Sequence, residues 1–143
     1  MKIIEVNEFT NEYLAAVQKL LGLLTSESHQ FTERNFRELL ACDNSHLFFL
    51  FDGNTVAGMT SAGIYRTPTG TKAWIEDVVV DESCRGKGFG RMLTQYAIDF
   101  MQSQKVDLLM LTSNPSRIAA NNLYQSMGFE RKETNVYRMK LGQ

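Results

Sequence analysis

The chain has few residues of the types that mark secreted, membrane or nucleic-acid-binding proteins. Two of its 143 residues are cysteines, which are too few for a disulfide framework and predict a reducing compartment. Fifteen basic and sixteen acidic side chains leave a net charge of -1, so no overall positive field attracts nucleic acid or anionic lipid. No stretch approaches the roughly 18 apolar residues of a membrane span, and the first residues lack a signal-peptide pattern. We therefore expect a cytoplasmic protein with neither nucleic acid nor a membrane as a partner.

Linker-like sequence and internal repeats are missing as well. The chain has only two prolines and no shift of composition along its length, so we expect a single domain over residues 1–143. A chain of this size buries about two-thirds of the surface that its unfolded form exposes, so it needs neither a disulfide nor a metal to fold. His29 and His46 share no ligand spacing with Cys42 and Cys84, and we therefore expect no metal site.

A glycine-rich, basic loop follows a run of valines beyond the middle of the chain. Residues 78–91 read VVVDESCRGKGFGR. Glycines let backbone N–H groups crowd around a phosphate, and the start of the amphipathic stretch that follows favours an anion. Arg85, Lys87 and Arg91 add positive charge. The segment predicts a site for a cofactor that carries a pyrophosphate, and the alternative is a solvated glycine-rich turn.

Two common phosphate-binding motifs do not fit this spacing. A P-loop has Ser or Thr after its Gly-Lys pair, whereas Gly88 follows Gly86 and Lys87 here. A dinucleotide fingerprint has a third glycine where this chain has Arg91, and its loop opens the first strand-helix unit of a domain. The loop therefore belongs to another class of anion site.

Apolar periodicity and turn residues predict a mixed order of strands and helices. A hairpin turn is expected at residues 52–54, where Asp-Gly-Asn joins two apolar runs. The last helix is expected to have Asn114 as its N-cap, Pro115 at its first position and Gly128 as its stop. The expected strands cover residues 2–6, 46–51, 55–65, 72–80, 106–112, 129–131 and 136–141, and the other expected helices cover residues 11–24, 32–41 and 89–103.

Three local patterns resemble one enzyme superfamily. The spacing Arg85-x-x-Gly88-x-Gly90 resembles the R/Q-x-x-G-x-G/A signature of the GNAT superfamily, the acyl-CoA-dependent N-acyltransferases. The order of elements is similar to that of the family along essentially the full length, and residues 121–129, NNLYQSMGF, resemble its late helix. Residues 75–80, IEDVVV, are similar to the central strand of glucosamine-phosphate N-acetyltransferases. The resemblance implies an α/β (α+β) fold in which four helices flank a mixed, mostly antiparallel sheet of about seven strands. Cys84 departs from the aromatic residue that many relatives carry before this arginine.

The resemblance implies acetyl-CoA (coenzyme A) as the cofactor. It implies a bulge in the central strand, which splays from the next parallel strand and opens a slot where the pantetheine arm pairs like an added strand. A backbone N–H at Val78 or its neighbours would then donate to the thioester oxygen. The implied cofactor-binding residues are Val78, Val79, Val80, Arg85, Gly86, Lys87, Gly88, Phe89, Gly90, Arg91, Asn121 and Tyr124.

Acetyl transfer to an amine requires a base, because an alkyl ammonium with a pKa near 10.4 is almost fully protonated at pH 7. Glu76 matches the family's base, acting directly or through a water. Strand alternation predicts that Glu76 and Asp77 point to opposite faces, so only one of them reaches a given substrate. The alternatives are that Asp77 or water is the base, or that Glu76 is a structural ion-pair partner.

The departing thiolate leaves more easily when it is protonated. Tyr124 keeps its proton at pH 7 and is the candidate acid, the alternative being a boundary tyrosine with a structural role. Asn121 lies on the same stripe of the predicted helix and would bond the pantetheine arm or remain exposed. Cys84 as a nucleophile is disfavoured, because neither histidine lies near an element that would activate it.

The acceptor is not fixed by the motifs. In this fold residues 24–45, which include Glu27, His29, Phe31, Glu33 and Arg34, would line much of the acceptor site. Their mixed charge suits a small-molecule or a peptide amine. The family often forms homodimers through its C-terminal strands, for which residues 136–141 could serve. A catalytically silent acyl-CoA-binding regulatory domain remains the second function, since such a domain needs only the loop.

Overall fold

The described chain, residues 1–25 and 30–142 of a computed structural model, divides into two units. The first is Met1–Thr112 and the second is Ser113–Gln143. The first unit holds every strand and three helices, and the second holds the last helix. The predicted positions Glu27 and His29 lie outside the described residues. The single domain over residues 1–143 stays a prediction.

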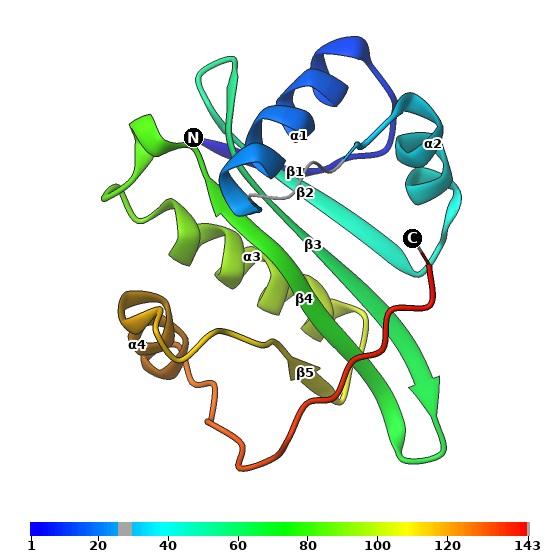
Figure 1. Ribbon diagram of the computed structural model, residues 1–143, viewed down its shortest axis with the longest axis vertical. Coiled ribbons are helices and arrows are strands. Elements are labelled where there is room, and N and C mark those ends of the chain that lie inside the picture. The colour runs from blue at the N-terminus through cyan, green and yellow to red at the C-terminus, as the bar shows by residue number, and fades with distance from the viewer. Residues whose placement is uncertain (26–29, 143) are drawn as a thin grey trace. The chain divides into compact units, whose positions relative to one another are not determined.

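A mixed five-stranded sheet forms the first unit (Figure 1). Its spatial order is β1-β2-β3-β4-β5, in which β1 to β4 are antiparallel neighbours and β5 runs parallel to β4. The crossover between the two parallel strands is α3. The strands are β1 (Lys2–Glu5), β2 (Ser45–Asp52), β3 (Thr55–Thr67), β4 (Gly70–Val80) and β5 (Leu108–Met110), and the helices are α1 (Asn11–Leu24), α2 (Glu33–Ala41), α3 (Phe89–Ser103) and α4 (Ile118–Ser126).

The expectation of about seven strands is wrong for the two C-terminal segments. Residues 129–131 and 136–141 form no strand in the described chain. The apolar residues Val136, Tyr137, Met139 and Leu141 are 69% to 90% exposed. Their alternation is a local pattern, whereas a strand exists only when its backbone groups pair with a neighbour. The α/β fold with four helices and a mixed, mostly antiparallel sheet is confirmed.

The first two helices begin at residues that cap them. The Thr10 side chain accepts a hydrogen bond from the Tyr13 amide at the start of α1, and Thr32 and Asn35 form a capping box at the start of α2. Such caps satisfy amides that the first turn leaves without an intrahelical partner. The predicted helices at residues 11–24 and 32–41 are therefore confirmed, with Thr32 as the cap of the second.

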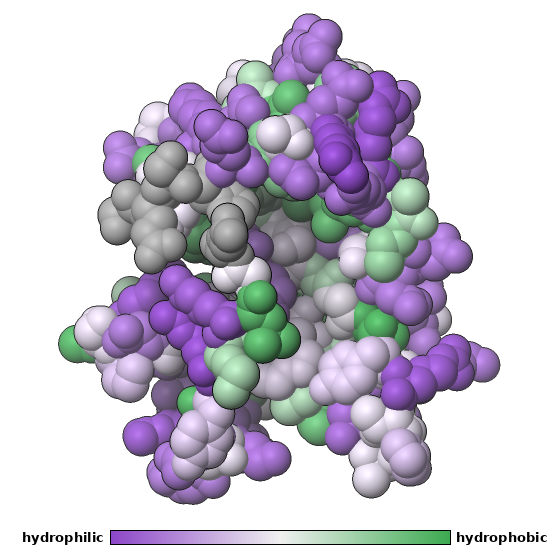
Figure 2. Space-filling view, turned by 45° about the vertical axis from the view of Figure 1, so that its right-hand side comes forward, coloured by the Kyte–Doolittle hydropathy of each residue, from purple (hydrophilic) through white to green (hydrophobic). Residues whose placement is uncertain are grey.

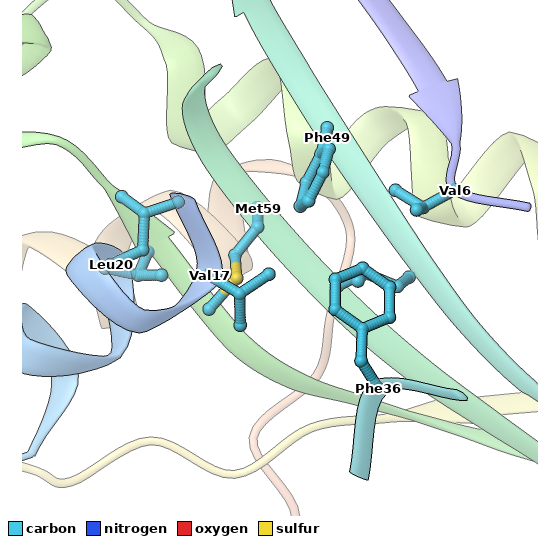
Figure 3. Packing of buried hydrophobic residues seen from close by; sticks show 8 residues of the cluster. Val6, Val17, Leu20, Phe36, Phe49 and Met59 are labelled. Carbon is cyan, nitrogen blue, oxygen red and sulfur yellow. The ribbon is translucent and has the colours of Figure 1, made fainter. Parts of the chain in front are cut away.

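Two hydrophobic layers cover the sheet. α1 and α2 pack on one face through a cluster that we call the α1–α2 cluster (Figure 3). α3 packs on the other face, where Leu93 meets Leu50 and Ala57, and Met101 meets Ala62 and Ala73. Burial of this apolar surface is the main force that holds the helices on the sheet. The buried members of the α1–α2 cluster are Val6, Val17, Leu20, Phe36, Leu47, Phe49, Met59 and Val79.

Hydrophilic residues predominate on the face shown in Figure 2, and hydrophobic ones occur there in small groups. Scattered apolar residues of this kind are normal for a solvated surface. No helix in the described ranges is long and apolar enough to cross a membrane.

The last helix starts later than predicted. Its N-cap is Arg117 rather than Asn114. Asn114 instead closes a turn, because its Oδ1 accepts hydrogen bonds from the amide and the hydroxyl of Ser116, at 2.9 and 2.8 Å. An Asn-Pro pair suits such a turn as well as it suits a helix start. The predicted stop is confirmed, since Gly128 follows α4 with a φ of 103°. The strand predicted at residues 106–112 is confirmed as the shorter β5.

Gly58 permits the close approach of α3 to the sheet. A Cβ at this position would lie 3.0 Å from Leu93 Cδ1 and 3.0 Å from the Val79 carbonyl oxygen. Gly58→Ala should therefore lower the free energy of unfolding by about 1–3 kcal/mol, the usual cost of overpacking. Gly22→Ala is the control, because a Cβ on this glycine of α1 meets nothing within 4 Å. That variant should gain up to about 1 kcal/mol from helix propensity. Urea unfolding of both variants checks the opposite signs.

Candidate active site

The predicted loop joins β4 to α3 and is open above its glycines. A 3-10 turn, Glu82–Cys84, follows β4. Gly86 and Gly88 then adopt φ values of 82° and 79°, which favour glycine over residues with a Cβ. A Cβ added at Gly86, Gly88 or Gly90 would meet nothing within 4 Å. The backbone of this loop can therefore be approached closely by a ligand.

The start of α3 presents amides to the same space. Gly88 is the N-cap of α3 and makes no side-chain capping bond. The first intrahelical bond to it comes from the Met92 amide, so the amides of Phe89 and Gly90 have no helical acceptor. Phe89 is 2% exposed and packs with Leu50 and Leu93, which fixes the first turn of α3 in place. This geometry suits an anion.

Two basic side chains of the loop are exposed. Lys87 Nζ lies 4.0 Å from Asp52 Oδ2, and both groups are about half exposed, so this contact is weak. No acidic side chain in the described residues lies within ion-pair distance of Arg85. Cys84 is half-buried against the cluster formed by Leu50 and Phe89. It thus packs as a small apolar residue, while Arg85 and Lys87 remain exposed.

β4 contains a bulge near its end, as the resemblance implied. Ser61 of β3 pairs with Glu76, but Met59 pairs with Val79, so two residues of β4 face one residue of β3. Asp77 takes the extra position with a φ of 52°, a conformation that aspartate tolerates better than most residues. The bulge shifts the facing of the strand by one residue.

Residues of β4 before and after the bulge pack into the core on opposite faces of the sheet. Ala73 packs with Met101 on the α3 face, whereas Val79 belongs to the α1–α2 cluster on the opposite face. Residues six apart in a regular strand would share one face. The prediction of strict alternation through residues 74–80 is therefore wrong, because the bulge interrupts it.

Glu76 and Asp77 consequently lie beside the same residue of β3. Ser61 pairs directly with Glu76, and its hydroxyl lies 3.4 Å from Asp77 Oδ2. Glu76 is exposed, but partial loss of solvent around its carboxyl raises the pKa, and the negative charge of Asp77 raises it further. The two carboxylates do not point to opposite faces as predicted.

Thr60 and Ser61 support the bulge and were not predicted from the sequence. Thr60 is fully buried, and its hydroxyl donates to the Glu76 carbonyl at 3.1 Å. The Ser61 hydroxyl lies 3.4 Å from the same carbonyl. These bonds satisfy a backbone group that the bulge takes out of the regular ladder. Nothing in the local sequence marks them, because their role follows from the pairing of two strands.

One edge of β4 is open beyond Trp74. β5 pairs with β4 only from Lys72 to Trp74, and no strand of the described chain pairs with the rest of β4 on that side. The Asp81 amide donates to the Ala57 carbonyl at 2.8 Å. Alternation then directs the backbone N–H of Val80 away from β3 and toward the open edge. An extended ligand can add to such an edge.

Tyr124 and Asn121 belong to the second unit. Tyr124 is 8% exposed, and its ring lies edge-on to Phe129 with centroids 6.1 Å apart. Burial raises the pKa of the Tyr124 phenol, against an opposing effect of the Arg117 charge, so this hydroxyl keeps its proton at neutral pH. Asn121 Nδ2 donates to the carbonyls of Asn114 and Arg117, so its amide nitrogen is engaged within the second unit.

The first unit therefore brings together a carboxylate pair, an open strand edge and a glycine-rich basic loop within residues 76–91. This arrangement leaves space for a ligand at the loop and along the strand edge. The acetyltransferase (GNAT) family model matches residues 14–129. The chain belongs to this family.

Similar proteins cover much of the chain. The uncharacterized N-acetyltransferase YhdJ of Bacillus subtilis is 30% identical over 105 residues, which are 68% of this chain and 72% of that protein. The N-alpha-acetyltransferase RimI of Mycobacterium tuberculosis is 31% identical over 97 residues, 67% of this chain and 59% of that protein. The mycothiol acetyltransferase of Renibacterium salmoninarum is 36% identical over 83 residues, 57% of this chain and only 25% of that protein.

Solved structures share the fold. A putative acetyltransferase from Agrobacterium tumefaciens has a TM-score of 0.86 at 21% identity and covers 98% of this chain and 100% of its own. The glucosamine-6-phosphate N-acetyltransferase of Arabidopsis thaliana has a TM-score of 0.79 at 21% identity, covering 97% and 99%. At these identities the likeness concerns the fold alone.

Proposed function

We propose that this protein is an N-acetyltransferase that moves the acetyl group of acetyl-CoA to a primary amine by direct attack in a ternary complex. The observation that carries the proposal is the bulge in β4. It sets the Glu76 carboxyl, whose pKa is raised, on the same short segment as the open edge and the glycine loop. A domain that only bound acyl-CoA would need the loop but not this carboxyl.

The residues of the first unit fit an anionic cofactor. The amides of Phe89 and Gly90 and the exposed side chains of Arg85 and Lys87 would hold the pyrophosphate. Gly86, Gly88 and Arg91 complete the loop around it, and the open edge at residues 78–80 would hold the pantetheine arm. When bound, acetyl-CoA supplies the thioester whose acetyl group is transferred.

Two side chains move the protons in this proposal. Glu76 accepts a proton from the incoming ammonium, directly or through a water, and a raised pKa makes a carboxylate a better base near neutral pH. The amine nitrogen would then form the bond to the acetyl carbon as the carbon–sulfur bond breaks, and it would lose its second proton to solvent. Tyr124 would donate its proton to the departing sulfur and regain one from solvent, and Glu76 would release the proton that it accepted. The role of Asn121 would be to orient the cofactor through its side-chain oxygen.

The proposed acceptor is a primary amine of a small molecule or a peptide. Among the relatives, RimI is named for N-alpha acetylation and the Renibacterium enzyme for mycothiol. Glu76 and Asp77 place negative charge where the amine would arrive, which favours a cationic acceptor. We also propose that the protein forms a homodimer and is located in the cytoplasm.

Binding of CoA tests the proposed site. CoA should raise the thermal midpoint, because a ligand at one hundred times its Kd stabilises the native state by about 2.7 kcal/mol. Gly90→Val should abolish this shift, since a Cβ at this position meets nothing within 4 Å and the valine side chain would occupy space that the pyrophosphate needs. The double variant with Gly88→Val should do the same, with added strain at Gly88.

Gly63→Val is the matched control for this experiment. Gly63 lies in β3, and a Cβ there meets only the Asn44 carbonyl oxygen, at 4.0 Å. The control should keep the full CoA shift. A CoA shift that survives in Gly90→Val would remove the assignment of the loop.

Asp77→Asn should change the pH profile without stopping the reaction. Asparagine tolerates the left-handed conformation of this position but lacks the charge that raises the pKa of Glu76. The pKa of Glu76 should therefore fall, and the acidic limb of kcat/KM should move to lower pH. Measurement of kcat/KM from pH 5 upward, at about half-unit steps, checks the direction. An acidic limb that stays in place would show that Asp77 does not act on Glu76.

A further inference from the structure

Asp81 stands where β4 turns into the glycine loop, and it is buried. Its residue exposure is 8%. One carboxylate oxygen, Oδ1, accepts hydrogen bonds from the amide and the hydroxyl of Ser83, both at 3.0 Å. The other, Oδ2, lies 3.0 Å from Nζ of Lys19. A buried carboxylate is costly unless it is paired and hydrogen-bonded, and here both oxygens have partners.

The backbone of Asp81 is bound as firmly as its side chain. Its amide donates to the Ala57 carbonyl of β3 at 2.8 Å, and its carbonyl accepts from the Cys84 amide at 2.9 Å. Asp81 therefore connects β3, the 3-10 turn and, through Lys19, helix α1. No other residue of the loop entry joins three elements in this way among the described hydrogen bonds and ion pairs.

The glycine loop requires a fixed point at the end that follows β4. Between the 3-10 turn and α3, the chain passes through Gly86 and Gly88, which restrict the backbone least. Phe89, buried against Leu50 and Leu93, fixes the end at α3. Asp81 is the corresponding fixed point at the β4 end. A loop held at both ends loses less conformational freedom when it closes around a ligand.

We infer that Asp81, tied to Lys19 of α1, is a positioning residue that sets the glycine loop for the pyrophosphate of the cofactor. The inference rests on the proposed function, because it assigns the loop to CoA. It gives α1 a part in cofactor binding although no residue of α1 belongs to the loop. Lys19 acts through Asp81 rather than on the phosphates.

A double-mutant cycle tests the role of the ion pair between Asp81 and Lys19. Asp81→Asn keeps the shape and one acceptor oxygen for Ser83, and Lys19→Met keeps the length of a side chain that is 70% exposed. Each single variant should raise the Kd for CoA by about tenfold. The Kd of the double variant should not exceed the higher of the two single-variant values, because both substitutions break the same ion pair. Lys2→Met is the matched control, an exposed lysine of β1 without a described ion-pair partner, and it should bind CoA like the unmodified protein.

Pantetheine, which lacks the pyrophosphate, separates positioning of the loop from general damage. The Kd for pantetheine, from a titration followed by amide NMR shifts, should be the same in the unmodified protein, in both single variants and in the double variant. Equal losses for CoA and pantetheine, additive losses in the cycle, or unchanged CoA binding in both single variants would each overturn the inference. If Asp81→Asn does not fold, Lys19→Met alone decides. If the unmodified protein binds CoA, Gly90→Val does not, and both Asp81→Asn and Lys19→Met bind normally, only this inference fails. If the unmodified protein does not bind CoA, the proposed function fails as well.

Discussion

Tyr124→Phe should lower turnover by about a hundredfold or more, the range expected when a general acid is lost. The ring of Tyr124 is buried and packs against Phe129, so phenylalanine preserves the packing and removes only the hydroxyl. Because burial raises the pKa of the phenol, the hydroxyl is protonated at neutral pH and can protonate the thiolate. CoA affinity should stay nearly unchanged. Turnover is measured under conditions in which the chemical step limits the rate.

Tyr137→Phe is the control for that variant. Tyr137 lies in the same unit and is 86% exposed, so loss of its hydroxyl should leave turnover as it is. Unaltered turnover in Tyr124→Phe, with chemistry limiting, would show that Tyr124 has a structural role.

Glu76→Gln should depress turnover at pH 7 by about a hundredfold, the lower range for a lost general base. Glutamine preserves the shape and the reach of the side chain but cannot accept the proton. In the unmodified protein the raised pKa of Glu76 places the acidic limb of kcat/KM above the ordinary range of a carboxyl, and activity rises as pH increases through that pKa. The variant should lack this limb and recover partly at alkaline pH, where more of the amine is neutral.

The pH profiles of Glu76→Gln and Asp77→Asn together identify the base. Alkaline rescue in Glu76→Gln alone supports Glu76. If Asp77→Asn shows the rescue and Glu76→Gln is silent, Asp77 is the base, which their common position beside Ser61 would explain. If neither variant shows it, the amine arrives neutral or loses its proton through ordered water.

The parts of the fold that depend on local chemistry were predictable. Apolar periodicity locates α1 and α2, and the turn at residues 52–54 locates the β2–β3 hairpin, because each signal lies within a few residues of the structure that it determines. The two predicted C-terminal strands failed because pairing depends on distant neighbours. Asn114 failed as a cap because the same Asn-Pro pair can close a turn.

The same distinction applies to the candidate site. The glycine loop is one continuous motif, so its candidate residues could be chosen from the sequence and from the family resemblance that the motif carries. The relation of Glu76 to Asp77 could not, because it depends on a register shift between β3 and β4. The hydrogen bonds of Thr60 and Ser61 to β4 and the ion pair between Asp81 and Lys19 likewise depend on contacts between elements far apart in the sequence.

The proposed transfer is tested most directly by incubating the protein with acetyl-CoA and a panel of primary amines that includes small molecules and peptides. Release of the CoA thiol and the acetylated amine, identified by mass spectrometry, are measured in the same samples. We predict that at least one amine is acetylated in equal amount to the thiol released, and that Tyr124→Phe and Glu76→Gln sharply reduce both. CoA binding with no thiol release above that of these two variants, for every amine, would contradict the proposal and favour a silent acyl-CoA-binding regulatory domain.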